Sequence, residues 1–252
     1  MLPRPPTATE QPIALFLDFD GTLVDIAPRP DDVVVSDTLK ALLEALHGAL
    51  GGALAVVSGR RLQDLLAHLA PVVLPAAGSH GLEYQVQAGR SHVASDARLP
   101  DSFWQAIESF VADRPGLLLE HKGHGAALHY RQAPELRDES HARLAELRDR
   151  DASDFELQAG KMVWELRPAG INKGTAIERL MQEAPFAGRL PVFVGDDVTD
   201  EDAFRVVNAK GGWTIHVGDG LATTEAKLGL PDVAAVDQWL RQINAGLSRH
   251  CA

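Results

Sequence analysis

Short runs of apolar residues alternate along much of the chain with longer stretches in which leucines recur at helical spacing. Residues 13–19 are apolar until they end in acids, which predicts a strand buried on both faces. Leucines from Leu39 to Leu50 fall on one face of a helix that Ser36 can cap. The same signals predict strands at 53–57, 72–75, 191–195 and 213–217, and helices at 62–69, 171–183, 199–207 and 231–243. This alternation predicts a parallel sheet with helices on both faces.

The middle of the chain has a different pattern, in which short runs flank glycines. Paired runs at 82–87 and 91–94, 117–121 and 126–131, and 155–158 and 162–167 predict hairpins, with helices at 101–113 and 135–150. Hairpins mixed with helices indicate an α+β unit. We therefore expect a Rossmann-like, doubly wound α/β core over residues 13–82 and 169–252, with an inserted α+β cap domain over 83–168. A Pro-rich tail over residues 1–12 is expected to be disordered.

The charge balance excludes some partners. The chain has 252 residues, with 24 basic against 35 acidic side chains and a net charge of −11. An acidic surface disfavours nucleic acid and anionic membranes, and no segment is apolar for long enough to span a bilayer. Cys251 is the lone cysteine, so no intramolecular disulfide can form, and the N-terminus lacks the apolar core of a secretory signal. We expect a soluble, cytoplasmic monomer.

Two acids close the first predicted strand. Asp18 and Asp20 lie two residues apart, so on an extended chain their carboxylates point to the same side and can meet one ligand at the carboxyl edge of the sheet. Gly21 permits a sharp turn and a close approach of the backbone to an anion. Two solvated loop acids would have the same sequence, but three further polar clusters also fall at strand ends or helix starts.

Two of these clusters carry groups suited to an anion. Ser58 and Arg60 flank Gly59 directly after the second strand, where a hydroxyl and free N–H groups at a helix start can bind an anion. Ser58 as a simple helix cap is the alternative. Lys173 lies at the start of a predicted helix, outside any Walker motif, and a solvated lysine is the alternative there.

The last cluster is acidic. Asp196, Asp197 and Asp200 follow the strand predicted at 191–195. Carboxylates this close repel one another unless a cation lies among them, and oxygen ligands without histidine or cysteine suit Mg²⁺. Acids at a helix start also interact favourably with its dipole, so Asp200 can serve the helix while Asp196 serves a metal.

In this order, the four motifs resemble those of the haloacid dehalogenase superfamily of phosphatases. The interval between Ser58 and Lys173 has room for a cap domain, as in that superfamily's type-two arrangement. Over about residues 13–245 the pattern is similar to the trehalose-6-phosphate phosphatase family. The shared segments are Gly-Ser-His-Gly at 78–81, Glu-x-Lys at 120–122, His-Tyr-Arg at 129–131 and Glu-x-Arg-Pro at 165–168.

The resemblance implies hydrolysis of trehalose 6-phosphate to trehalose and phosphate in two steps. Asp18 would attack phosphorus to form an aspartyl-phosphate. Asp20 would protonate the leaving oxygen and then activate water. Ser58 and Lys173 would hold the oxygens of the transferring phosphoryl group, which is largely an electrostatic task.

The resemblance also implies a Mg²⁺ cofactor. The side chains of Asp18 and Asp196 and the carbonyl of Asp20 would hold the ion. Asp197 and Asp200 would fix the metal ligands or their waters.

For the cap, the resemblance implies a set of residues that binds the sugar. The glucose unit that lies away from the phosphate would be bound by Glu120, Lys122 and Glu165, with Arg131 and His80 as further contributors. Taken without the resemblance, the same residues could be the solvated side of an antiparallel sheet. Two other functions stay open: a related capped phosphatase acting on a sucrose or mannosyl phosphate, and a sugar-phosphate sensor without catalysis.

Overall fold

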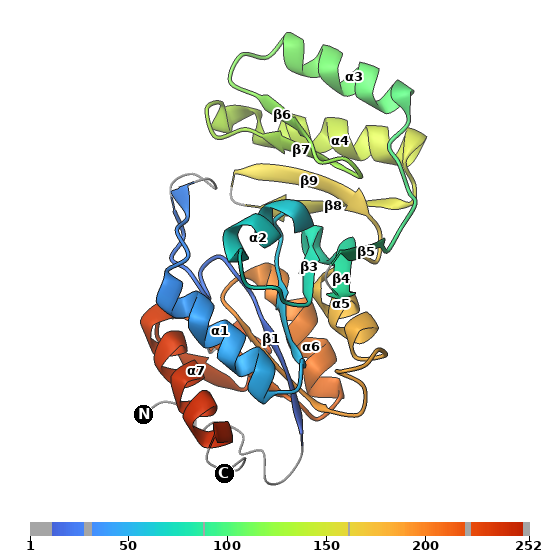
Figure 1. Ribbon diagram of the computed structural model, residues 1–252. Helices are drawn as coiled ribbons and strands as arrows, with labels where there is room; N and C mark the ends of the chain where they lie inside the picture. Colours follow the sequence, from blue (N-terminus) through green and yellow to red (C-terminus); the bar gives the residue numbers. More distant parts are fainter. Residues whose placement is uncertain (1–11, 28–31, 88, 161, 220–222, 249–252) are drawn as a thin grey trace. The chain divides into compact units, whose positions relative to one another are not determined.

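Figure 1 shows the computed structural model, which describes residues 12–27, 32–87, 89–160, 162–219 and 223–248. Apart from Pro12, the tail predicted over 1–12 lies outside these residues. The chain divides into two compact units, of which the first runs up to Ala94 and resumes at Asn172, and the second comprises Ser95–Ile171. No helix in the described part of the chain has the length and apolar composition that crossing a bilayer requires.

The first unit contains one large sheet and most of the helices. Its strands are β1 (Ile13–Leu17), β2 (Leu54–Val57), β3 (Ala76–Gly78), β4 (Glu83–Gln87), β5 (Arg90–Val93), β10 (Leu190–Gly195), β11 (Trp213–Val217) and β12 (Leu228–Leu230). Its helices are α1 (Asp37–Ala49), α2 (Leu62–Leu69), α5 (Lys173–Leu180), α6 (Glu201–Ala209) and α7 (Val233–Ser248), with short 3₁₀ turns η2 (Ser79–Gly81) and η4 (Val198–Asp200).

The sheet of the first unit is doubly wound. Its strand order is β12-β11-β10-β1-β2-β3-β4-β5, and the pairs from β12 to β3 are parallel. Along β1, Leu15 and Leu17 pack with α1, α2 and α7, while Ala14 and Phe16 pack with α5 and α6 on the other face. Helices therefore cover both faces, which is why β1 is apolar without interruption. The predicted α/β class and the α+β character of the insert are confirmed.

The third strand differs from its prediction. The bulky apolar run at 72–75 predicts a strand, but the strand is β3, formed by the small residues that follow it. Pro75 lacks an N–H and contributes only its carbonyl, which accepts from Val56 N at 3.1 Å. Val73 is 56% exposed, so this run does not have the two buried faces of a central strand.

The boundary of the insert also differs from the prediction. The hairpin formed by β4 and β5 pairs antiparallel with β3 and extends the large sheet. Residues 83–94 therefore belong to the first unit, and the second begins at Ser95 rather than at residue 83. A hairpin pattern specifies local pairing but not the sheet that it joins, which depends on contacts with a strand outside the hairpin.

The second unit packs two helices on one antiparallel sheet. Its elements are α3 (Asp101–Ala112), β6 (Leu118–His121), β7 (Ala126–His129), η3 (Pro134–Leu136), α4 (Arg137–Asp151), β8 (Phe155–Gly160) and β9 (Val163–Pro168). The strand order is β6-β7-β9-β8. Leu128, Trp164 and Leu166 from the sheet join Phe103 of α3 and Leu144 of α4 in one buried cluster.

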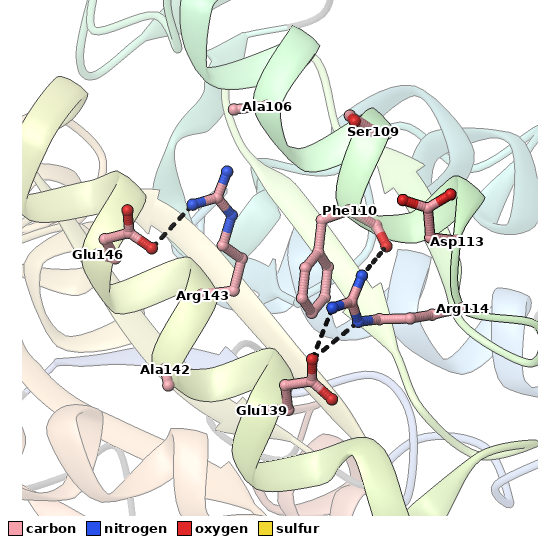
Figure 2. Close-up of a pocket in the computed structure, with 9 residues that line it drawn as sticks. All are labelled: Ala106, Ser109, Phe110, Asp113, Arg114, Glu139, Ala142, Arg143 and Glu146. Atoms are coloured by element: carbon pink, nitrogen blue, oxygen red, sulfur yellow. Dashed lines mark hydrogen bonds and ion pairs between the residues drawn. The ribbon is translucent and has the colours of Figure 1, made fainter.

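A hollow of about 530 Å³ lies between α3 and α4 (Figure 2). Arg114 lies over the ring of Phe110 and donates to Glu139 at 2.7 and 2.9 Å. Arg143 donates to Glu146 at 2.8 Å. Both arginines are already paired with glutamates of α4, whereas α3 contributes the uncharged Ala106, Ser109 and Phe110 to the lining.

Candidate active site

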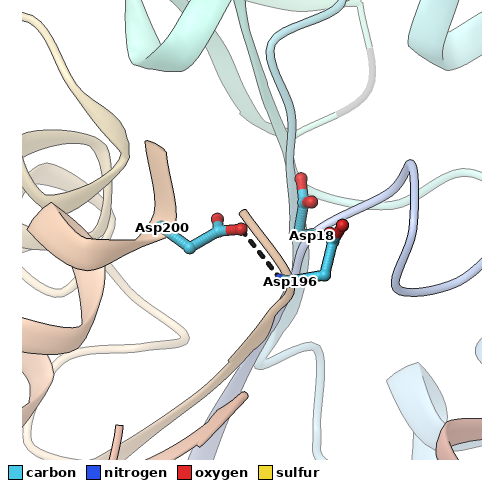
Figure 3. Close-up of side chains that lie close together, drawn as sticks. All are labelled: Asp18, Asp196 and Asp200. Atoms are coloured by element: carbon cyan, nitrogen blue, oxygen red, sulfur yellow. Dashed lines mark hydrogen bonds between the residues drawn. The ribbon is translucent and has the colours of Figure 1, made fainter. Parts of the chain in front are cut away.

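The carboxyl ends of β1 and β10 place two acids side by side. These strands pair in parallel with Leu17 opposite Val194, and Asp18 N donates to Val194 O at 2.9 Å. Asp18 follows β1 directly and Asp196 follows β10 directly. Their carboxylates and that of Asp200 each offer an oxygen, and these oxygens lie within 4.8 Å of one another (Figure 3). The parallel topology therefore brings Asp18 and Asp196, two of the predicted metal ligands, together with Asp200.

Lys173 is the buried counter-charge of this group. It is the first residue of α5, whose start is fixed by Asn172 and Thr175 in a capping box. Its Nζ lies 2.7 Å from Asp18 Oδ1 and 2.7 Å from Asp200 Oδ1. Burial by itself would lower the pKa of Lys173, but the two carboxylates outweigh burial and raise it. Lys173 is therefore a fixed cation.

One lysine does not neutralise three carboxylates. Burial raises the pKa of Asp18 well above its ordinary value, with a further rise from the charge of Asp200 and an opposing effect from Lys173. Burial and the same neighbouring carboxylate raise the pKa of Asp196 to about 6. The excess negative charge and the all-oxygen donor set fit a hard divalent cation.

Asp200 has both oxygens engaged inside the protein. Its Oδ1 accepts from Lys173, and its Oδ2 accepts from the backbone N–H groups of Asp196 and Asp197 at 3.0 Å each. Asp200 is fully buried, whereas Asp197 is exposed and caps η4 through Val198 N. Asp200 therefore orders the loop that carries the other acids.

Two residues of the first motif shape the space around Asp196. Thr22 Oγ1 donates to Asp196 Oδ1 at 3.2 Å. Gly21 has φ +81°, and a Cβ there would lie 2.1 Å from Asp196 Oδ2. Only glycine allows this close approach. The sequence predicts no role for Thr22. Asp18, Asp20 and Thr22 are nevertheless each two residues apart.

Asp20 faces a different partner. Its carboxylate accepts from Arg60 Nε at 2.7 Å and from Arg60 Nη2 at 2.6 Å. Among the described residues, its carboxylate does not belong to the group formed by Asp18, Asp196 and Asp200. Arg60 belongs to the motif after the second predicted strand, but the sequence predicts no role for it. Its place directly after β2, beside β1, is the signal that could have linked it to Asp20.

Ser58 and His80 lie next to each other on this edge of the sheet. Ser58 is buried, and its Oγ accepts from Arg60 N at 3.1 Å. Its carbonyl accepts from His80 N at 3.0 Å. The ring of His80 lies against Gly59, where a Cβ would come within 2.8 Å of the ring. The structure thus brings His80 to the Ser58 motif.

The remaining predicted residues lie in the second unit. Glu120 of β6 lies opposite Ala127 of β7, and Ala127 lies opposite Glu165 of β9. These residues therefore share one face of the small sheet. On this face Lys122 Nζ lies 2.6 Å from Glu165 Oε1, and His129 Nε2 lies 2.9 Å from Glu120 Oε2.

Arg131 is exposed and follows β7. Among the described residues, Arg131 forms no ion pair with the charges on this face. The four residues Glu120, Lys122, His129 and Glu165 are therefore the ones that the sheet brings together.

Comparison with known proteins places the chain in a family. A family model described as trehalose-phosphatase matches residues 16–228. The trehalose-6-phosphate phosphatase of Escherichia coli (strain K12) is 43% identical over 241 residues, covering 94% of this chain and 88% of that protein. The matched region includes every predicted core motif.

Solved structures agree with this assignment. The crystal structure of a trehalose-6-phosphate phosphatase related protein matches with a TM-score of 0.75 and 28% identity, covering 95% of this chain and all of that one. The C-terminal domain of the Candida albicans trehalose-6-phosphate phosphatase has the same fold, with a TM-score of 0.76, 23% identity and coverage of 95% and 93%. This chain belongs to the trehalose-phosphatase family, whose members are phosphoric monoester hydrolases.

Proposed function

We propose that this protein hydrolyses trehalose 6-phosphate to trehalose and phosphate through an aspartyl-phosphate intermediate. The observation that carries the proposal is the buried Asp18 beside Lys173 at the end of β1, in a chain that matches trehalose-phosphatases over residues 16–228. A panel of sugar phosphates, including sucrose and mannosyl phosphates, with release of inorganic phosphate as the readout, tests the substrate. Preference for another sugar phosphate would contradict the proposal.

The two chemical steps divide between two carboxyl groups. An oxygen of Asp18 forms a bond to phosphorus while the bond from phosphorus to the sugar oxygen breaks, and the proton of the Asp20 carboxyl passes to that oxygen. Water then attacks phosphorus, its proton returns to Asp20, and the bond from phosphorus to Asp18 breaks. The enzyme returns to its starting state.

Lys173 and Ser58 are proposed to hold the phosphoryl oxygens. An ammonium has three donors, and Asp18 and Asp200 account for two on Lys173, which leaves a third for an oxygen of the substrate. Ser58 Oγ accepts from Arg60 N, so its own O–H is available to donate. Donors held in place before the substrate arrives stabilise developing charge without reorganisation.

A magnesium ion is the proposed cofactor. The side chains of Asp18 and Asp196 and the carbonyl of Asp20 would hold it, while Asp200 and Asp197 order the loop that carries Asp196. When bound, the ion would supply positive charge that offsets the charge of the nucleophile and the phosphate.

The raised pKa of Asp196 predicts how stability depends on pH without metal. Between pH 3.8 and about pH 6 the folded protein retains a proton that the unfolded chain has lost. The free energy of unfolding therefore falls as pH rises through this window, and it remains lower above it. Mg²⁺ binds the ionised carboxylate. At about pH 7.5, a Mg²⁺ concentration near 100 times its Kd should therefore raise the free energy of unfolding by about 2.7 kcal/mol, and at about pH 5 the same concentration should raise it by less.

Thermal unfolding with and without MgCl₂ at both pH values measures this effect. Asp196→Asn should lose most of the Mg²⁺-dependent rise in Tm and reduce the pH dependence of the metal-free protein, with the contribution of Asp18 remaining. An unchanged rise in Tm in this variant would show that the ion binds elsewhere.

We also propose that the polar face of the second unit binds the sugar. Glu120, Lys122 and Glu165 offer charged acceptors and donors to sugar hydroxyls, with Arg131 and His80 as further contributors. Such charged hydrogen bonds contribute about 1.5–3 kcal/mol each. On this proposal the second unit acts as a cap over the substrate.

Lys122→Met tests the sugar contact. We expect kcat/KM for trehalose 6-phosphate to fall about 10- to 100-fold, because the variant loses one charged hydrogen bond to the sugar. Hydrolysis of p-nitrophenyl phosphate, which has no sugar, should change little. Lys210→Met, at an exposed position after α6, is the matched control. Equal losses on both substrates would remove Lys122 from the sugar site.

A sensor without catalysis is the alternative from another class. A sensor has no need of both a nucleophile and an acid, and Asp18, Asp20, Lys173 and Asp196 are all present. Tight binding of trehalose 6-phosphate without Mg²⁺-dependent turnover would favour the sensor.

We further propose that the protein is a cytoplasmic monomer. Sedimentation equilibrium would check the oligomeric state, and cell fractionation would check the location.

A further inference from the structure

The carboxylate of Asp20 is clamped by Arg60. Two guanidinium nitrogens of one arginine donate to the two carboxylate oxygens, at 2.6 and 2.7 Å. The Arg60 side chain is 12% exposed and that of Asp20 is 35% exposed. A fork of two parallel hydrogen bonds fixes the plane of a carboxylate as well as its position. A single donor would leave the carboxylate free to rotate.

Arg60 is itself held on several sides. Its guanidinium lies 5.3 Å from the centre of the buried Phe19 ring, and its backbone carbonyl accepts from Ser79 N at 2.6 Å. Its Nη1 lies 3.1 Å from His68 Nε2, on α2. Because a guanidinium can only donate, His68 Nε2 must accept, so the proton of the neutral ring is on Nδ1. The contacts leave the guanidinium little freedom to turn.

The clamp leaves part of Asp20 available for chemistry. Each carboxylate oxygen has two lone pairs, and Arg60 takes one on each. The side chain of Asp20 is partly exposed, so the remaining lone pairs can exchange a proton with a substrate or a water. Orientation and proton transfer can therefore coexist in the same arrangement.

We propose that Arg60 and His68 are positioning residues, which hold the Asp20 carboxyl in the direction needed for proton transfer to the departing sugar oxygen. The proposal rests on the proposed role of Asp20. Arg60 acts through Asp20, and His68 acts through Arg60.

The leaving group provides the test. A sugar alkoxide needs a proton as it departs, whereas p-nitrophenolate is stable without one, so general acid catalysis matters for the first and little for the second. We expect Arg60→Met to lower kcat for trehalose 6-phosphate about 10- to 100-fold and to change kcat for p-nitrophenyl phosphate less than about threefold. His68→Leu should also lower kcat for trehalose 6-phosphate relative to kcat for p-nitrophenyl phosphate, but by less than Arg60→Met does. His68→Gln, which keeps an acceptor near the position of Nε2, should restore it.

A double-mutant cycle separates positioning from an independent effect. Asp20→Asn removes the group that is positioned, so Arg60→Met should add no further loss on the sugar phosphate in that background. Arg61→Met is the matched control, since Arg61 is exposed and adjacent, and both substrates should be unaffected. Thermal unfolding of each variant, with Arg60→Lys as a milder change, shows whether the fold persists.

The outcomes distinguish the inference from the function on which it rests. Equal losses on both substrates in Asp20→Asn would overturn the proposed role of Asp20 and this inference with it. A selective loss in Asp20→Asn combined with an unselective or additive effect of Arg60→Met would overturn the positioning role alone. The positioning role is supported if Arg60→Met lowers kcat mainly for trehalose 6-phosphate, adds no loss to Asp20→Asn, and His68→Gln keeps the activity that His68→Leu loses.

Discussion

Asp18→Asn is expected to lower the rate of phosphate release by at least about 10⁴-fold, because an amide cannot form the proposed aspartyl-phosphate and loss of the proposed nucleophile removes both chemical steps. The residual rate would come from binding and from the charges of Lys173 and its neighbours. Release of inorganic phosphate from trehalose 6-phosphate in the presence of Mg²⁺ is the measurement. Retained turnover would exclude Asp18 as the nucleophile.

The same variant should keep its fold. Burial and Asp200 raise the pKa of Asp18 well above its ordinary value, so its ionised form is costly near neutral pH. Asparagine has nearly the same shape and removes that charge, while Lys173 retains its 2.7 Å pair with Asp200. We expect Tm without metal to be equal to or above that of the wild type. A large fall in Tm would mean that lost activity reports lost folding.

Lys173→Met should destabilise the protein by about 3–5 kcal/mol, because it leaves two buried carboxylates without their counter-ion. Lys173 is 3% exposed and lies 2.7 Å from both Asp18 and Asp200, so water cannot replace it readily. Activity should be lost together with stability, since the same ammonium is proposed to hold the phosphoryl group. Urea unfolding at neutral pH measures the change in the free energy of unfolding.

Adding Asp18→Asn to Lys173→Met separates the two effects. Removing one of the unpaired carboxylates should recover part of the lost free energy of unfolding, while phosphate release stays absent. Lys210→Met, at an exposed position, should leave the free energy of unfolding within about 0.5 kcal/mol of the wild type. If the double variant is no more stable than Lys173→Met, repulsion between buried carboxylates is not the cause of the instability.

Much of the fold could be predicted from periodicity. The predicted strands at 53–57, 191–195 and 213–217 coincide closely with β2, β10 and β11, because most of their buried positions are apolar; β11 also buries Thr214 and His216. The helix with leucines from Leu39 to Leu50 is α1, and the predicted cap is present, with Ser36 Oγ accepting from Leu39 N at 3.2 Å. Periodicity succeeds where burial on defined faces constrains every position.

The prediction was wrong where burial depends on partners outside the segment. The residues of β3 are alanines and a glycine, which carry little strand signal, and they form a strand because β2 lies beside them. The β4–β5 hairpin was correctly predicted as a hairpin, but only pairing with β3 assigns it to the large sheet. The short strand β12 was missed for the same reason, since it pairs only with β11 among the described strands.

The sequence by itself determined the chemical types at the candidate site and their order, because acids that follow buried strands must emerge at one edge of a parallel sheet. It could not decide which group pairs with which. These pairings depend on the lateral order of β10, β1 and β2 and on the packing of α5. They place Lys173 between Asp18 and Asp200, and they place Arg60 against Asp20. Electrostatic pairing acts over a few ångströms in space, and residues distant along the chain reach that range only when the sheet has formed.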